Sequence, residues 1–147
     1  MGLARGALSV TIAGDRLEHE VLIRAPAELV FAFFTDAELY PRSMGREATL
    51  DPRPGGIYRC VVHDTATVLG EYVVVEPPRR VVFTWGFEGG AGVPAGSSTV
   101  AVTLTPVEEG TLLRLVHTGL PHPALAGHEK GWAGYLGTLE RAAAGPA

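Results

Sequence analysis

The residues of this chain that are best suited to chemistry are its histidines. Four of them stand at positions 63, 117, 122 and 128. None has the HExxH spacing that places two imidazoles on one helix face around zinc, and Asp64 beside His63 is an ordinary turn pair. The chain also has a single cysteine, which excludes a multi-thiolate cluster. The sequence therefore predicts no metal site and no cofactor.

Nucleophilic and acid–base chemistry also lack support. Ser97 and Ser98 have neither a nucleophile elbow nor a partnered histidine. Glu71 is expected on an outer strand face, and Cys60 is expected to be a small buried apolar residue. His117 ends a strand just before a turn, where it could bond a backbone group near the following helix, the interpretation we favour, or contact a ligand. We predict no catalytic residue.

The elements that position these residues begin with the strands. Alternating apolar residues predict six strands, and short connections at 76–79 and 106–110 favour antiparallel neighbours. Charged residues mark outer faces, so Tyr58 points inward beside Arg59, and Leu115 and His117 point inward beside Arg114. Trp85 shares an inner face with Val81 and Phe83. The predicted strands are residues 17–24, 57–63, 67–75, 80–85, 98–105 and 111–118.

The helices are expected in two places. Pro26 opens a first short helix, and Thr35 with Asp36 caps a second, one-turn helix that Pro41 stops. Residues 122–144 predict one long helix. Its apolar stripe at helical spacing consists of Leu125, His128, Trp132, Tyr135, Leu136 and Leu139.

This order of elements predicts an α+β fold in which a curved antiparallel sheet wraps around the long C-terminal helix, with two short N-terminal helices. We expect a single domain over residues 1–147, with the pattern clearest over 17–141. Side chains on the inner faces should then converge on a mainly apolar cavity of the kind that binds small molecules. The predicted ligand-binding residues are Tyr58, Trp85, Leu115, His117, Trp132 and Tyr135.

Composition excludes several classes of function. Hydrophobic residues make up 46% of the 147 residues and charged residues 19%, which favours a folded domain. With 12 basic and 16 acidic residues the net charge is −4, and no basic cluster exceeds a pair, so we expect no nucleic-acid partner. No apolar run approaches the roughly 20 residues of a membrane span, and residues 1–10 make a poor signal peptide. We expect a cytoplasmic protein.

Four stretches in order resemble one known group of proteins. They are IRAPAELVFAFFTDAEL at 23–39, DPRPGGIYR at 51–59, GEYVVVEPPRRVVFTW at 70–85, and GTLLRLVHTGLP with a later GW pair within 110–136. They resemble the START-like (SRPBCC, birch-pollen-allergen-like) superfamily, and within it the type called activator of heat-shock protein 90 ATPase homologue. The resemblance covers roughly residues 17–141 and implies the helix-grip fold.

The resemblance and the inward-facing residues together favour a protein that binds a small apolar or amphipathic molecule and is not catalytic. Two alternatives stay open. A polyketide-cyclase-like enzyme could use the same cavity, with His117, Tyr58 or Tyr135 guiding proton transfer. A protein-interaction or stress-response module would expose an apolar patch in place of a cavity. Homodimer formation is also left open.

Overall fold

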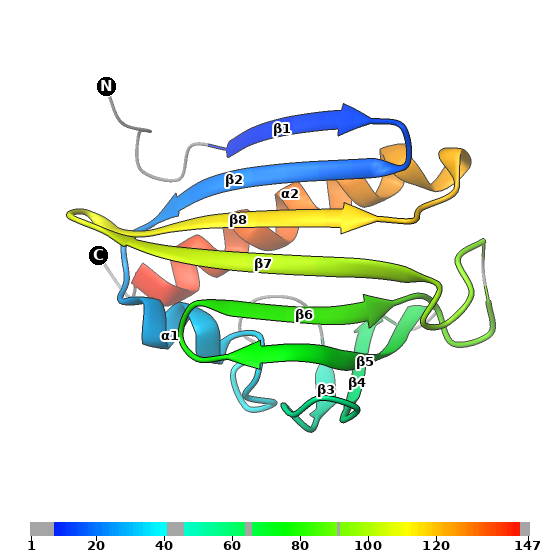
Figure 1. Ribbon diagram of the computed structural model, residues 1–147, viewed down its shortest axis with the longest axis horizontal. Helices are drawn as coiled ribbons and strands as arrows, with labels where there is room; N and C mark the ends of the chain where they lie inside the picture. Colours follow the sequence, from blue (N-terminus) through cyan, green and yellow to red (C-terminus); the bar gives the residue numbers. More distant parts are fainter. Residues whose placement is uncertain (1–7, 41–45, 64–65, 91, 145–147) are drawn as a thin grey trace.

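The chain is described from a computed structural model, which places residues 8–40, 46–63, 66–90 and 92–144. Eight antiparallel strands form a single sheet with the order β1-β2-β8-β7-β6-β5-β4-β3, seen edge to edge in Figure 1. Two α-helices, α1 (Ala27–Ala32) and α2 (His122–Ala144), lie within the described residues. The strands are β1 Leu8–Ala13, β2 Arg16–Ile23, β3 Glu47–Leu50, β4 Ile57–His63, β5 Ala66–Glu76, β6 Arg80–Trp85, β7 Ser98–Val107 and β8 Gly110–Thr118.

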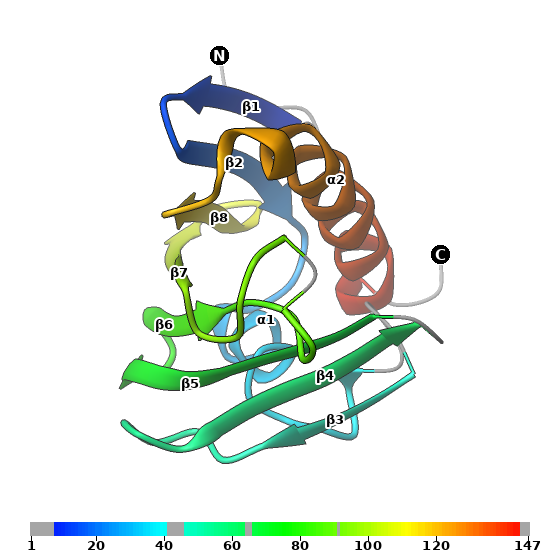
Figure 2. The ribbon, with the colours of Figure 1, turned by 90° about the vertical axis from the view of Figure 1, so that its right-hand side faces the viewer.

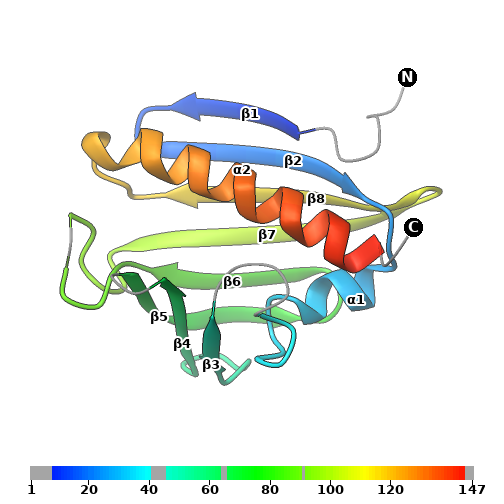
Figure 3. The same cartoon turned by 180° about the vertical axis from the view of Figure 1, so that it is seen from behind.

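The sheet curves around its inner face, as Figure 2 shows, with β1, β2 and β8 on one limb and β3, β4 and β5 on the other. Helix α2 lies along the inner face and crosses in front of β2 and β8, while α1 sits near its C-terminal end (Figure 3). The expected α+β fold, a curved antiparallel sheet around a long C-terminal helix, is confirmed.

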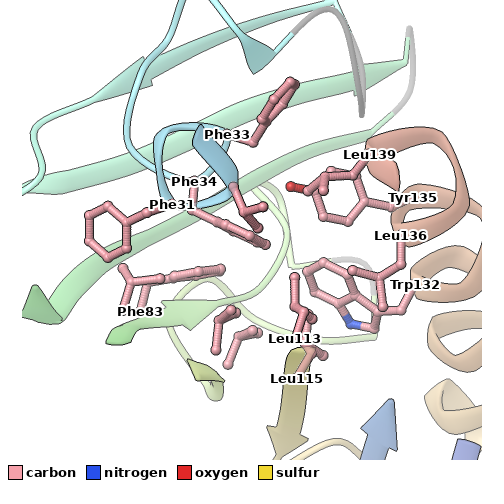
Figure 4. Packing of buried hydrophobic residues seen from close by; sticks show 14 of the residues in the cluster. Phe31, Phe33, Phe34, Phe83, Leu113, Leu115, Trp132, Tyr135, Leu136 and Leu139 are labelled. Atoms are coloured by element: carbon pink, nitrogen blue, oxygen red, sulfur yellow. The ribbon is translucent and has the colours of Figure 1, made fainter. Parts of the chain in front are cut away.

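Helix α2 has the bounds that the sequence predicts, and it runs through Gly131 without a break. Its apolar stripe turns toward the sheet because residues three and four apart share one face of a helix. Trp132, Leu136 and Leu139 are each at most 2% exposed. Just past the middle of the helix, the ring of Tyr135 packs edge-on against Phe34, with 5.8 Å between centroids (Figure 4). This part of α2 is therefore packed against the segment that follows α1.

The strand faces follow the alternation that the charged residues indicate. On β8, Leu113, Leu115 and His117 are fully buried, whereas Arg114 points outward and pairs with Glu18 of β2 at 2.6 Å. Because side chains alternate along a strand, one outward charge fixes the direction of its neighbours. The inner face is consequently an almost continuous apolar surface facing α2.

The expected second short helix is wrong. Residues 33–39 form turns, in which the N–H of Glu38 donates to Oδ1 of Asp36 at 2.9 Å. Asp36 thus caps a single turn that does not continue as a helix, and Pro41, which was expected to end it, lies outside the described residues. Phe33 and Phe34 in this segment, and Tyr40 just after it, are buried in the core.

Two strands were not expected. Strand β1 pairs with β2 along its whole length, from Leu8 opposite Val21 to Ala13 opposite Arg16, and Gly14 makes the connecting turn with a φ of 63°. Strand β3 pairs with β4 over four residues. Each of these strands lies at an edge of the sheet and pairs with one neighbour. Their formation depends on that neighbour more than on an alternating apolar pattern in their own sequence.

Candidate functional site

A pocket of about 640 Å³ lies between α2 and the limb of the sheet formed by β4 and β5. This volume is within the range that holds a small organic molecule. On the sheet side the lining residues are apolar and come from three places, the facing ends of β4 and β5, the end of β6, and the loop between β6 and β7. They are Val62, Ala66, Val68, Trp85, Phe87 and Val93.

The loop between β6 and β7 contributes two of these residues because it folds back onto β5. Phe87 forms isolated bridges with Val68 and with Pro94, and Val93 is 1% exposed. Gly86 allows the close approach, since a Cβ there would collide with the carbonyl oxygen of Pro94. No site residue was expected in this loop, so Phe87 and Val93 were missed as wall residues.

The α2 side of the pocket has few side chains at its centre. Gly127, Gly131 and Gly134 face the pocket at a spacing of four and three residues, and no heavy atom lies within 4 Å of the position a Cβ would take on any of them. Each glycine costs roughly 1 kcal/mol of helix stability relative to alanine. We call these three residues the glycine face; around it α2 adds Ala124, His128, Lys130, Trp132, Tyr135 and Thr138.

A chain of hydrogen bonds lies behind the indole of Trp132. Its Nε1–H donates to Nδ1 of His117 at 2.9 Å. Because an indole can only donate, Nδ1 accepts and the proton of the neutral imidazole sits on Nε2. Nε2 then donates to Oγ of Ser98 at 2.8 Å, and Ser98 donates to the carbonyl oxygen of Trp85 at 2.8 Å. Each side-chain polar atom in this series of hydrogen bonds therefore has a partner.

His128 holds the second indole in the same way. Nε1–H of Trp85 donates to Nε2 of His128 at 3.1 Å, so Nδ1 carries the proton and donates to the carbonyl oxygen of Ala124 at 2.9 Å. Both imidazoles therefore have their lone pair occupied by an indole. Burial lowers the pKa of His117 to about 3, helped by the neighbouring His128 and His19, and burial also lowers the pKa of His128.

The other groups that could react are also neutral and covered. Burial raises the pKa of the Cys60 thiol to about 12, against hydrogen bonds from Tyr58 and Tyr40 that lower it. Burial likewise raises the pKa of the Tyr58 phenol well above its ordinary value. A thiol with such a pKa is a poor nucleophile at neutral pH. The arrangement supports an apolar cavity whose polar groups hold its walls in place.

The six predicted ligand-binding residues fall into two groups. Trp85, Trp132 and Tyr135 line the pocket. Tyr58, Leu115 and His117 are buried but do not line it. The ring of Tyr58 stacks on Phe83 with 4.0 Å between centroids, and His117 lies behind Trp132. An inward direction was correctly inferred, but these three side chains are buried in the protein interior away from the pocket. Contact of any of the six with a ligand stays a prediction.

Within the described ranges, no group of three or more His, Cys, Asp or Glu residues is placed to hold a metal ion. In the same part of the chain, no helix is both long enough and apolar enough to cross a membrane.

The relationship to known proteins is decided by one family match. Residues 24–144 match the family described as Activator of Hsp90 ATPase homolog 1-like protein. The chain belongs to this family. The resemblance inferred from four short motifs is thereby confirmed, and the AHSA1-like fold supports a ligand-binding domain. No curated protein matches the chain.

Solved structures agree with this membership. The AHSA1-like protein RHE_CH02687 (residues 1–152) of Rhizobium etli is 40% identical, with a TM-score of 0.71, and the match covers 98% of this chain and 88% of that one. CalU16 of Micromonospora echinospora is 27% identical, with a TM-score of 0.68 and coverage of 90% and 81%. Protein MLL2253 of Mesorhizobium loti is 24% identical, with a TM-score of 0.77 and coverage of 86% and 95%, and shows the shared fold alone.

Proposed function

We propose that this protein binds one small apolar or amphipathic molecule in the pocket between α2 and the β4–β5 limb, and that it does so without catalysing a reaction. The observation that carries the proposal is the glycine face of α2, in front of which a pocket of about 640 Å³ is left unfilled by side chains. Apolar and aromatic surface that lines an open recess of this size is in contact with water, and an apolar molecule that covers it is bound favourably.

The chemistry of the walls favours binding over the enzyme alternative. A cyclase-like mechanism needs a group that can take or give a proton at the ligand. The lone pairs of His117 and His128 are already engaged by indole N–H groups. Tyr58 does not line the pocket, which leaves Tyr135 as the one member of the proposed proton-transfer set on its wall.

The interaction-module alternative has weaker support than the cavity. Among the described residues, the large apolar side chains that are exposed are scattered over five separate elements or turns, and scattered single residues are normal on a protein surface. They are Ile12, Leu29, Ile57, Val73 and Val107.

The proposal is tested with an environment-sensitive hydrophobic dye. The folded protein should bind it with a stoichiometry of one to one. Gly131→Leu should weaken binding at least tenfold, because the new side chain projects into open pocket space. Gly137→Leu is the matched control, since Gly137 is on the same helix but does not line the pocket. The proposal would be overturned if the Gly131→Leu and Gly137→Leu variants bound the dye with equal affinity, or if the dye bound only when the protein unfolds.

A further inference from the structure

We infer that the molecule bound in this pocket carries one negatively charged group, held at the mouth beside Lys130, and that the rest of it is apolar. This inference rests on the proposed function and narrows its ligand class. Two features of the described residues lead to it, namely how the polar atoms of the wall are used and how charge is distributed on α2.

Four polar side chains of the inner wall, those of Trp85, His128, Trp132 and Thr138, have their hydrogen-bonding atoms engaged within the protein. The indole N–H groups of Trp85 and Trp132 donate to histidines, and both ring nitrogens of His128 are bonded. Oγ1 of Thr138 donates to the carbonyl oxygen of Gly134 at 3.1 Å. A polar group carried into this space would lose its water and gain no partner, which is unfavourable. The part of the ligand that lies against these four side chains should therefore be apolar.

Lys130 differs from the other polar residues of the wall. It lines the pocket from an exposed position on α2, and no ion pair joins it to any of the described residues. An ammonium group is a strongly hydrated point charge on a flexible stem, and it can meet a carboxylate, sulfonate or phosphate without leaving water. A ligand with its charge at the mouth would satisfy Lys130 and keep its own apolar part inside.

Charge on α2 is divided between two sides of the helix. Lys130 and Arg141 are eleven residues apart, so at 100° per residue they lie within about 20° of the same direction. Arg141 donates to Oγ1 of the pocket residue Thr138 at 3.3 Å, which places this side at the pocket. Glu129 and Glu140 share a second side about 100° away from the first, and there Glu129 interacts with His19 of β2. Although the chain has a net charge of −4, the α2 edge of the pocket is positive.

Two dyes with the same apolar body test this directly. 8-Anilinonaphthalene-1-sulfonate and N-phenyl-1-naphthylamine share their aromatic rings, and only the first carries a sulfonate. Lys130→Gln should weaken binding of the sulfonate dye about two- to fivefold, the usual strength of a solvent-exposed ion pair, and leave the neutral dye unchanged. Binding of the sulfonate dye to the unmodified protein should also weaken with added salt.

Arg79→Gln provides the matched control. Arg79 is exposed in the turn between β5 and β6 and does not line the pocket, so this variant changes the net charge equally without changing the mouth. It should leave the affinity ratio of the two dyes as it is. The inference is overturned if Lys130→Gln does not weaken binding of the sulfonate dye relative to the neutral dye, or if Arg79→Gln weakens it to the same extent. If Gly131→Leu affects neither dye, the proposed function itself has failed.

Discussion

The two long faces of α2 show how differently one helix can be used. The core face, formed by Trp132, Leu136 and Leu139, is almost fully buried against the sheet. The glycine face, formed by Gly127, Gly131 and Gly134, meets open space. Packing stabilises the first, whereas the second weakens the helix by roughly 1 kcal/mol for each glycine. The difference suggests that the core face holds the fold together and that the glycine face serves the pocket.

Truncation on the core face should have the largest effect. Trp132→Ala removes a buried indole and the hydrogen bond to His117, and should lower the free energy of unfolding by roughly 3 to 5 kcal/mol. Lys130→Ala, two residues earlier and exposed, should change it by less than about 0.5 kcal/mol. Urea denaturation measures both. A loss below about 1 kcal/mol for Trp132→Ala would show that the indole is not part of the packed core.

Acid should destabilise the protein through the histidines whose pKa is lowered by burial. The pKa of His117 is about 3 in the folded state against an ordinary 6.5, so between these values the unfolded state binds the extra proton and stability falls as pH falls. From pH 7 to pH 5 the loss from His117 alone should be about 2 kcal/mol. Burial also lowers the pKa values of His19 and His128, which adds loss in the same direction.

Urea melts at several pH values measure this loss. In His117→Gln the slope of stability against pH should be smaller by the contribution of one site. His122→Gln is the control, because His122 is exposed at the start of α2. A slope that is the same in His117→Gln and in the unmodified protein would show that His117 is not held neutral by the fold.

Substitution on the glycine face should have a smaller effect on stability than loss of Trp132 or protonation of the histidines, and the opposite sign. Gly131→Ala adds a methyl group into open space, so it should raise the free energy of unfolding by about 0.5 to 1 kcal/mol. The same methyl reduces the depth of the pocket and should weaken dye binding measurably. If Gly131→Ala instead lowered stability, the open space beside this residue would be in doubt.

Much of the core face could be predicted from the sequence, and much of the pocket could not. The bounds of α2 and the burial of Trp132, Leu136 and Leu139 follow from apolar residues at helical spacing. The pocket depends on glycines of α2, which have no side chain to fill the space, and on the loop between β6 and β7, which folds back onto β5. Nothing in the local pattern indicates that Gly131 faces a cavity, or that Phe87 reaches it. Those placements depend on long-range packing.

The histidines illustrate the same limit. Alternation along β8 correctly placed His117 inside, yet its contact with Trp132 depends on where α2 crosses the sheet. His19 is also on an inner face and fully buried, but neither of its ring nitrogens has a hydrogen-bond partner among the described residues. Two histidines with the same sequence signal therefore have different surroundings, and only the fold distinguishes them.

The central claim is that the glycine face is the wall of a ligand site, and an NMR titration tests it most directly. Adding the sulfonate dye to ¹⁵N-labelled protein should shift the backbone amides of Gly127, Gly131 and Gly134 and the indole N–H signals of the chain's two tryptophans, Trp85 and Trp132. The amide of Gly14, in the turn between β1 and β2, should stay in place. Shifts that gather elsewhere while these three glycines stay unchanged would contradict the account.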